Sequence, residues 1–388
     1  MTNLELQART EERSRPLRIC VVTGSHWSAV QGGAQYQAKC LVERIVRGGN
    51  AEVFYLARKI HAAGEGAGYT ACRIGHRGLI GRQGFFVDAL SLLRTLRKIQ
   101  PDVIYQRGLQ AYTGIAALYC RRHPCRFVFH IAHDYDVTPA AELHRSWRSP
   151  GKRIDRAIGS YGVRAAFAVI AQTRHQAALL RETYGRECAL MVPNFHPAPD
   201  VIEKKRGATT RVVWVANFKP IKRPEMAVEL AGTLAGRRDI EFVMIGRSGD
   251  GRIYGSLLER IGAARNIAYL GERSIEEVNS VLEGADIFLN TSVAEGFPNT
   301  FIQAWLREVP VISFDVDPDG ALEAEGLGFM VKDVESARRR ICELSDDAAL
   351  REEMGRRARC YAMERHSMRN ADAIMSLIEG RSSGASVC

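Results

Sequence analysis

The sequence lacks the patterns of several common protein classes. Its nine cysteines form no C-x-x-C pair and are odd in number, which favours a reduced, cytosolic protein over a disulfide scaffold. The N-terminus is charged and has no apolar core of a signal peptide, and no apolar run approaches the roughly 18 residues of a membrane span. We therefore expect a cytoplasmic protein without a transmembrane segment.

Signatures of several enzyme classes are also missing. There is no G-x-G-x-x-G dinucleotide pattern and no His/Cys spacing typical of a metal site, and no G-x-S-x-G run follows a predicted strand as a nucleophile elbow does. The missing dinucleotide pattern argues against a nicotinamide or flavin enzyme.

Positive charge is in excess, with a net charge of +10. Such a charge is compatible with nucleic acid or an anionic membrane. The basic residues are scattered and no nucleic-acid-binding signature appears, so we expect no nucleic-acid partner. Residues 85–98 predict an amphipathic helix with a basic edge, which could lie against anionic lipid. Ordinary packing of this helix on a sheet is the favoured alternative.

The length of 388 residues, with 46% hydrophobic and 25% charged residues, favours two domains. Short apolar segments alternate with helical patterns in both halves, which predicts two doubly wound parallel sheets of the α/β class. The predicted strands are 17–23, 51–56, 102–106, 126–131, 168–172 and 189–192 in the first half, and 211–216, 240–245, 267–270, 286–290 and 309–314 in the second.

The domain boundaries follow from this alternation and from a segment with prolines, glycines and basic residues but no apolar periodicity. Near the C-terminus, the arginines at 338–340 and 356–357 are predicted to lie on solvated helix faces. The predicted parts are a disordered extension (1–16), a first domain (17–198), a linker (199–210), a second domain (211–364), and a C-terminal helix that crosses back to the first domain and ends in a frayed tail (365–388).

The most informative segment is 292–305, SVAEGFPNTFIQAW, which follows a predicted strand and leads into a helix expected to begin near Thr300. Open parallel sheets bind ligands at this end of their strands. Glu295 lies on the loop, Gly296 allows close backbone approach, and Asn299 can cap the helix. An anion could rest on that helix start.

Other loops follow strands in the same way. The loop 215–224 collects three cations within five residues, which suits a pyrophosphate leaving group. Loops 245–249 and 269–274 would frame a nucleotide at the same edge. In the first domain, Gly32 and Gly33 precede a helix, so their backbone N–H groups either face a diphosphate or form a plain turn.

The segment 292–305 resembles the donor-site motif of retaining GT-B glycosyltransferases of family 4, in which two carboxylates stand eight positions apart. Glu295 matches the first carboxylate, and Gln303 replaces the second. The resemblance covers most of the chain and is stronger in the second half, where Pro310 and the turn 326–328 fall in family order. It implies a GT-B architecture of two Rossmann-like domains facing across a cleft, with the acceptor side in the first domain.

The resemblance also implies roles for single residues. Glu295 would contact the donor sugar, Gln303 the ribose hydroxyls, and Lys222 the phosphates. Asn217 replaces a family arginine, which Lys219 could compensate. The implied donor-binding residues are Gly32, Gly33, Asn217, Gly246, Arg247, Gly271, Gly296, Phe297, Pro298, Asn299, Thr300 and Gln303.

Two further features follow the first-domain strand 126–131. His133 would line the donor sugar by the resemblance, or else is a surface or capping histidine. Asp134 and Asp136 imitate the D-x-D metal motif of the other large transferase fold. Because GT-B enzymes stabilise the leaving group with cations and helix starts, the resemblance implies neither a bound metal nor a cofactor. Pro298 removes a backbone donor, which we interpret as a subfamily variation.

The implied reaction moves a sugar from a nucleotide-diphosphate sugar, with UDP or GDP as the nucleotide, to a hydroxyl of a glycan or lipid-linked acceptor. The anomeric configuration would be retained through an ion-pair, same-face displacement. Cell-surface polysaccharide synthesis at the inner face of the membrane is the expected setting. Three alternatives stay open: a sugar-nucleotide epimerase, a non-catalytic nucleotide-binding protein, which the changes at Asn217 and Gln303 would favour, and a nucleic-acid-binding protein.

Overall fold

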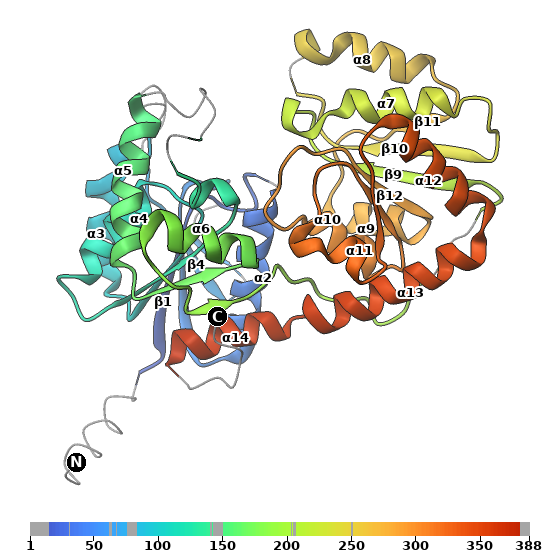
Figure 1. The fold of residues 1–388 in the computed structure, drawn as a ribbon. Helices are drawn as coiled ribbons and strands as arrows, with labels where there is room; N and C mark the ends of the chain where they lie inside the picture. Colours follow the sequence, from blue (N-terminus) through green and yellow to red (C-terminus); the bar gives the residue numbers. More distant parts are fainter. Residues whose placement is uncertain are drawn as a thin grey trace. The chain divides into compact units, whose positions relative to one another are not determined.

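The computed structural model describes residues 15–380 except 31, 62–63, 67, 76–83, 140–141, 143–149, 203, 205–206 and 250. The chain divides into two compact units, the first of residues 1–193 and 369–388 and the second of residues 194–368 (Figure 1). Most of the predicted N-terminal extension, and the tail 381–388, lie outside the described residues.

The first unit contains a sheet in the order β3-β4-β2-β1-β5-β6-β7-β8. All neighbours are parallel except the antiparallel pair β3 and β4. The strands are β1 (Leu17–Ser25), β2 (Ala51–Lys59), β3 (Gly64–Gly66), β4 (Tyr69–Arg73), β5 (Val103–Arg107), β6 (Arg126–His130), β7 (Ala168–Ala171) and β8 (Leu190–Met191).

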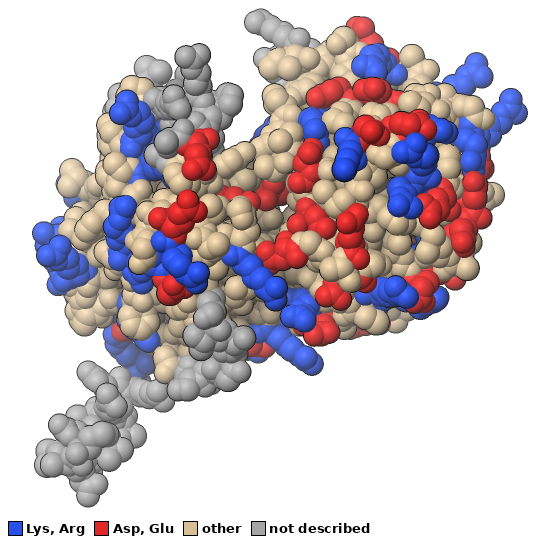
Figure 2. All heavy atoms as spheres, viewed as in Figure 1, with Lys and Arg blue, Asp and Glu red and all other residues tan. Residues whose placement is uncertain are grey.

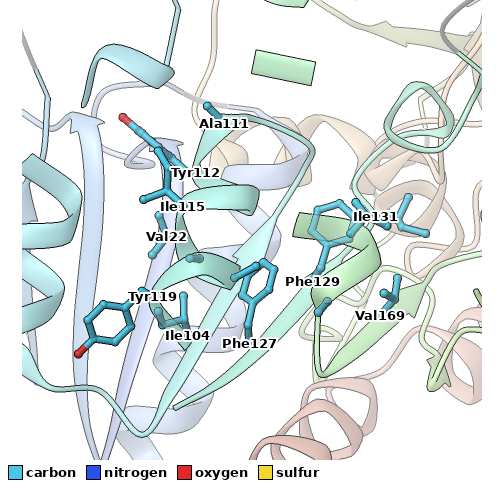
Figure 3. Close-up of a cluster of buried hydrophobic side chains, with 14 of the residues drawn as sticks. Val22, Ile104, Ala111, Tyr112, Ile115, Tyr119, Phe127, Phe129, Ile131 and Val169 are labelled. Carbon is cyan, nitrogen blue, oxygen red and sulfur yellow. The ribbon is translucent and has the colours of Figure 1, made fainter. Parts of the chain in front are cut away.

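Helices cover this sheet because its strands are apolar on both faces. Val22, Ile104 and Phe127 point from one face into a buried cluster with Tyr112 and Tyr119 of α4 (Figure 3). The helices of the first unit are α2 (Gly33–Gly48), α3 (Ala89–Ile99), α4 (Ala111–Cys120), α5 (Pro150–Ala165), α6 (Arg174–Tyr184) and α14 (Arg369–Glu379), with short 3-10 turns η2 (Phe86–Asp88) and η3 (Asp134–Asp136).

The amphipathic segment 85–98 packs its apolar side inside the first unit. Leu92 and Leu96 of α3 are fully buried, and the Tyr119 hydroxyl donates to the Leu96 carbonyl at 3.1 Å. Arg97 and Lys98 stay exposed. The favoured alternative, a helix packed within the domain, is therefore what the structure contains. No helix among the described residues has the length and apolar character that crossing a membrane requires.

The second unit contains six parallel strands in the order β11-β10-β9-β12-β13-β14. Buried clusters on both faces of this sheet make it the middle layer of a three-layer unit. The strands are β9 (Thr210–Val215), β10 (Ile240–Ile245), β11 (Ile267–Tyr269), β12 (Ile287–Asn290), β13 (Val311–Ser313) and β14 (Gly328–Met330), and the helices are α7 (Pro224–Thr233), α8 (Gly251–Ala263), α9 (Ile275–Glu283), α10 (Asn299–Trp305), α11 (Ala321–Ala324), α12 (Val334–Asp346) and α13 (Ala348–Arg365), with 3-10 turns η5 (Pro220–Lys222) and η6 (Pro318–Gly320). The prediction of two doubly wound sheets is confirmed.

Charged side chains of α12 and α13 lie on solvated faces, as predicted. Arg338 pairs with Glu335, and Arg356 and Arg357 pair with Glu353, each at 2.9 Å. Figure 2 shows basic and acidic side chains interspersed over the visible face of the second unit. Exposed pairs of this kind are screened by solvent and contribute little to stability.

The chain passes between the units at positions that differ from the predicted boundaries. The second unit begins at Asn194, and Asn194 to His196 are buried. The predicted linker 199–210 thus belongs to the second unit. Helix α14 groups with the first unit, where Arg44 pairs with Asp372 at 2.8 Å.

Candidate functional site

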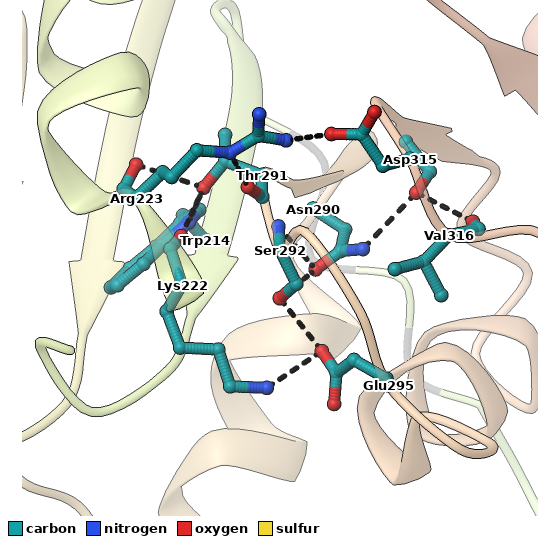
Figure 4. A network of polar contacts seen from close by, with 10 residues as sticks. Trp214, Lys222, Arg223, Asn290, Thr291, Ser292, Glu295, Asp315 and Val316 are labelled. Carbon is teal, nitrogen blue, oxygen red and sulfur yellow. Dashed lines mark hydrogen bonds and ion pairs between the residues drawn. The ribbon is translucent and has the colours of Figure 1, made fainter. Parts of the chain in front are cut away.

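Lys222 and Glu295 meet at the carboxyl ends of two neighbouring strands. Lys222 ends η5, which follows β9, and Glu295 lies on the loop after β12, the strand paired with β9. Lys222 Nζ lies 2.7 Å from Glu295 Oε1, and the two side chains are 23% and 19% exposed. Figure 4 shows the two tips pointing toward one another. The structure therefore brings together the two residues to which the sequence analysis assigned the donor sugar and its phosphates, and which we predict to be catalytic together with His133 of the first unit.

The carboxylate of Glu295 is oriented by residues at the end of β12. Ser292 Oγ lies 2.7 Å from Glu295 Oε1 and 2.8 Å from Asn290 Oδ1, so its single proton is shared between the two oxygens. Asn290 in turn donates to Ser313 Oγ at 3.1 Å. The sequence analysis assigned no role to Ser292 or Asn290. The signal in the sequence was that these two polar residues lie three and five positions before Glu295, at the end of a predicted strand.

The backbone of Lys222 is fixed to the same loop. The buried hydroxyl of Thr291 accepts a hydrogen bond from Trp214 Nε1 at 2.9 Å and donates to the Lys222 carbonyl at 2.6 Å. Val293 N also donates to the Ile221 carbonyl at 2.9 Å. Both backbones of the ion pair are thus held, while the charged tips keep contact with solvent.

The other two cations of the loop 215–224 point elsewhere. Arg223 has a left-handed backbone conformation, with φ 45°, and its guanidinium binds the Thr291 carbonyl and the Asp315 carboxylate (Figure 4). Lys219 is exposed at the start of η5. The cluster of three cations therefore splits, and only Lys222 contacts Glu295.

Asn217 fastens the loop that follows β10. Its Oδ1 accepts a hydrogen bond from Arg247 N at 3.0 Å, and the Arg247 side chain is exposed. Gly246 has φ 146°, and a Cβ there would lie 1.8 Å from the Ala216 carbonyl, so only glycine fits. Gly246 N donates to the carbonyl of Gly271 at 2.9 Å. The loops predicted to frame a nucleotide are therefore bonded to one another.

Helix α10 begins one residue earlier than expected. Asn299 is its first residue, and Pro298 occupies the N-cap position without a side-chain cap. The prediction that Asn299 caps the helix is therefore wrong, because the turn after Pro298 already has helical geometry at Asn299. Thr300 follows it, partly buried. Gln303 is buried, and its amide donates to Asn279 Oδ1 of α9 at 2.8 Å.

The remaining loop residues flank this helix. Gly296 is partly buried, and Phe297 is buried with its ring 4.4 Å from that of His366. The contacts proposed for these residues and for Gln303 with a donor stay predictions.

In the first unit, Gly32 and Gly33 form the start of α2. Gly32 is the N-cap, with extended backbone, and Gly33 is the first helical residue. A Cβ on Gly32 would meet only the flexible end of Gln35. The helix therefore begins one residue earlier than predicted, at Gly33 itself, and the diphosphate role stays a prediction.

His133 acts as a cap in the structure. It precedes η3, its Nδ1 accepts from Tyr135 N at 3.2 Å, and its ring stacks on Tyr135 at 4.3 Å. Asp136 accepts from Ala132 N at 2.7 Å, and Asp134 accepts from Gln176 at 2.9 Å. The D-x-D carboxylates therefore hold this loop together. Within the described part of the chain, no three His, Cys, Asp or Glu side chains group as metal ligands would.

Models of two glycosyltransferase families match the chain. Residues 31–195 match the model of Glycosyltransferase Family 4, and residues 209–347 match the model of Glycosyl transferases group 1. No curated protein matches the chain.

Solved structures match over nearly the whole length. Sucrose-phosphate synthase from Thermosynechococcus elongatus is similar with TM-score 0.75 and 16% identity, over 94% of this chain and 98% of that one. WaaG, a glycosyltransferase involved in lipopolysaccharide biosynthesis, is similar with TM-score 0.73 and 14% identity, over 93% and 100%. HepE of Anabaena, solved with UDP-glucose, is similar with TM-score 0.70 and 16% identity, over 94% and 100%. With its two matched domains and the GT-B fold, the chain is a glycosyltransferase of the family 4 and group 1 type.

Proposed function

We propose that the chain is a retaining glycosyltransferase that binds a nucleotide-diphosphate sugar at the carboxyl edge of the second sheet. The observation that carries this proposal is the ion pair of Lys222 with Glu295. An ammonium group suits a diphosphate, and a carboxylate suits sugar hydroxyls. A UDP- or GDP-sugar is the proposed donor, and the UDP-glucose complex of the similar HepE supports UDP.

The ion pair suits a site that waits for a charged ligand. Without donor, each charge balances the other, so neither is left unpaired in a partly buried site. When the donor binds, Lys222 turns to the diphosphate and Glu295 is released to the sugar. Ser292 keeps one oxygen of Glu295 oriented during this exchange. The site is therefore pre-organised on the backbone and adjustable at the tips.

The chemical step needs little from a protein base. The bond between the anomeric carbon and the diphosphate oxygen breaks, and Lys222 stabilises the negative charge that develops. The acceptor hydroxyl attacks from the same face, and the departing phosphate oxygen takes its proton. Arg247, exposed on the adjacent loop, supplies a second cation near the position where Asn217 replaces an arginine. No metal ion or cofactor is part of this proposal.

The proposed acceptor is a hydroxyl of a glycan or lipid-linked saccharide, used in cell-surface polysaccharide synthesis. The proposed location is the cytoplasm, at the inner face of the membrane. Support comes from the net charge of +10 and from the exposed edge of α3, where Leu90 lies beside Arg94, Arg97 and Lys98. A basic edge with an exposed leucine suits an anionic lipid surface.

The test is a transfer assay with UDP-glucose, GDP-mannose and ADP-glucose as donors. It is run with and without lipid-linked saccharides as acceptors. The proposal predicts acceptor-dependent release of one nucleoside diphosphate and, by NMR of the product, the donor's own anomeric configuration. Conversion of the sugar without acceptor would instead indicate an epimerase. Binding of nucleotide without any turnover would support a non-catalytic protein, which the bond of Gln303 to Asn279 favours as the second candidate.

A further inference from the structure

The loop that carries Glu295 is held at its far end by residues distant in sequence. Asn194 is 4% exposed, and its Nδ2 donates to the Phe297 carbonyl at 2.8 Å across 103 positions. Phe297 is two residues after Glu295. At the near end, Ser292 and Asn290 hold the same loop. Both ends of the loop are thus fixed by buried polar groups.

We propose that Asn194 is a positioning residue for the donor sugar, acting through the Phe297 peptide to hold the Glu295 loop in its binding conformation. This inference rests on the proposed function and deepens it. The Asn194 amide donates to the backbone carbonyl of Phe297, so the effect proposed for it on the sugar passes through the loop.

His366 fixes Asn194 from the other side. Its Nδ1 lies 2.7 Å from the Asn194 carbonyl, and because a carbonyl only accepts, Nδ1 carries the proton. Burial lowers the pKa of His366 to about 4, so the ring is neutral at neutral pH. The same ring packs 4.4 Å from Phe297. One histidine therefore orients Asn194 and supports the residue that Asn194 binds.

His196 completes the arrangement. Its backbone N donates to the His366 carbonyl at 2.9 Å, and its buried ring is hydrogen-bonded to the side chain of Asn299. Asn194 and His196 thus hold the residues on either side of Pro298. Since Pro298 offers no N–H of its own, these neighbours are the points at which the loop can be fastened.

The segment that fastens the loop also lies where the chain enters the second unit. Asn194 is the first residue of this unit, and His366 lies three positions before the chain returns to the first unit at Arg369. A change in the path of either crossing would therefore act directly on Phe297. The Glu295 loop is therefore connected to both points at which the chain passes between the units, and the sequence of the loop does not indicate this connection.

The test separates binding of the sugar from binding of the nucleotide. Dissociation constants of UDP, GDP, ADP, UDP-glucose, GDP-mannose and ADP-glucose are measured by calorimetry for the full chain and for Asn194→Ala. We expect the affinity for the bound sugar conjugate to fall about tenfold, as for one lost buried hydrogen bond. The affinity for the free diphosphate should change less than about threefold.

Asn370→Ala is the matched control. Asn370 Nδ2 donates to the Pro193 carbonyl at 3.1 Å at the same crossing, and not to the Phe297 carbonyl that Asn194 binds, so the sugar preference should be unchanged. If Asn194→Ala does not fold, His366→Phe keeps a ring against Phe297 but removes the Nδ1 donor, and a smaller loss of sugar preference is expected.

The outcomes separate the two proposals. Equal loss for diphosphate and conjugate, or no loss for either, would overturn the positioning role while leaving the proposed function standing. No binding of any of the six compounds to the natural chain would overturn both.

Discussion

The carboxyl edges of the two sheets differ in what their polar side chains bind. At both edges the loops bond to one another, since Thr291 binds the Lys222 carbonyl in the second unit and Asp136 accepts from Leu109 N at 3.0 Å in the first. In the second unit these bonds leave the tips of the Lys222 and Glu295 pair partly exposed. In the first unit the side chains of His133, Asp134 and Asp136 bind other groups of the protein and hold the loop after β6. The second edge is therefore the one that presents a charged pair to a ligand.

The largest effect is expected for Glu295→Ala. Loss of the carboxylate removes the sugar contact and leaves Lys222 without its partner, so transfer should fall about 100- to 1,000-fold in kcat/KM. Thermal unfolding should change little, because the pair is partly exposed. The control is Glu335→Ala, an exposed carboxylate of α12 paired with Arg338. A fully active Glu295→Ala variant would remove Glu295 from the site.

The second effect is a loss of stability, and it tests the close contact between Gly246 and Ala216, which lie on neighbouring loops. Gly246→Ala would place a Cβ 1.8 Å from the Ala216 carbonyl at a φ of 146°, so we expect a loss of about 2–3 kcal/mol in stability. Gly255→Ala, on α8 where a Cβ meets nothing within 4 Å, should be neutral or stabilising by up to about 1 kcal/mol. Urea unfolding of both variants measures the contrast, and equal midpoints would contradict it.

Lys222→Ala should weaken binding of the nucleoside diphosphate about tenfold, with the loss shrinking at high salt. Lys219→Ala is the matched control, because Lys219 lies in the same loop but is exposed and unpaired with Glu295. Titration calorimetry of UDP and GDP at two salt concentrations distinguishes them. Equal affinities of Lys222→Ala and the natural chain would exclude Lys222 from the phosphate site.

A smaller effect is expected from pH. Burial lowers the folded-state pKa of His366 to about 4, below the ordinary value of 6.5. As pH falls, His366 therefore binds a proton in the unfolded chain before it does so in the folded chain. The stability that the neutral ring contributes is present above pH 6.5 and is lost between pH 6.5 and about pH 4. Buried His196, with a pKa lowered to about 3, acts in the same direction.

Thermal unfolding at pH 7.5 and pH 5 should show this loss, about 2 kcal/mol from His366 at pH 5. His366→Phe should reduce the difference between the two pH values. A variant with the same pH dependence as the natural chain would show that His366 does not contribute.

The smallest effect is expected in the first unit. His133→Ala removes a local cap, which should cost about 1 kcal/mol or less and lower transfer less than about tenfold. Comparison with Glu295→Ala in one transfer assay decides whether the two edges differ as described. A loss at His133 as large as at Glu295 would restore the donor-sugar role that the resemblance implied for it.

Sequence patterns predicted the elements whose signals are local. The strands 240–245 and 211–216 were placed within one residue of β10 and β9, because continuous apolar runs between helical patterns are read directly. The strands β4 and β14 were not predicted, since polar residues interrupt the apolar run of β4 and β14 begins within the glycine-containing turn 326–328.

The predicted site was incomplete for a similar reason. Glu295 and Lys222 are recognisable from motifs, but Asn194 bonds to a carbonyl 103 positions away. The partner of Gln303, Asn279, lies on another helix. Contacts of this kind depend on how elements pack, and no spacing in the sequence encodes them. The motifs therefore located the site, and the folded chain supplied its supports.

The most direct test of the account is a thermal-shift panel of UDP, GDP, ADP and their sugar conjugates on the natural chain and on Glu295→Ala. Stabilisation grows with ligand concentration over the dissociation constant. The account predicts a shift with one nucleotide class, a further shift with its sugar conjugate, and loss of that further shift alone in Glu295→Ala. Absence of any shift in the natural chain, or an equal sugar-dependent shift in both proteins, would contradict it.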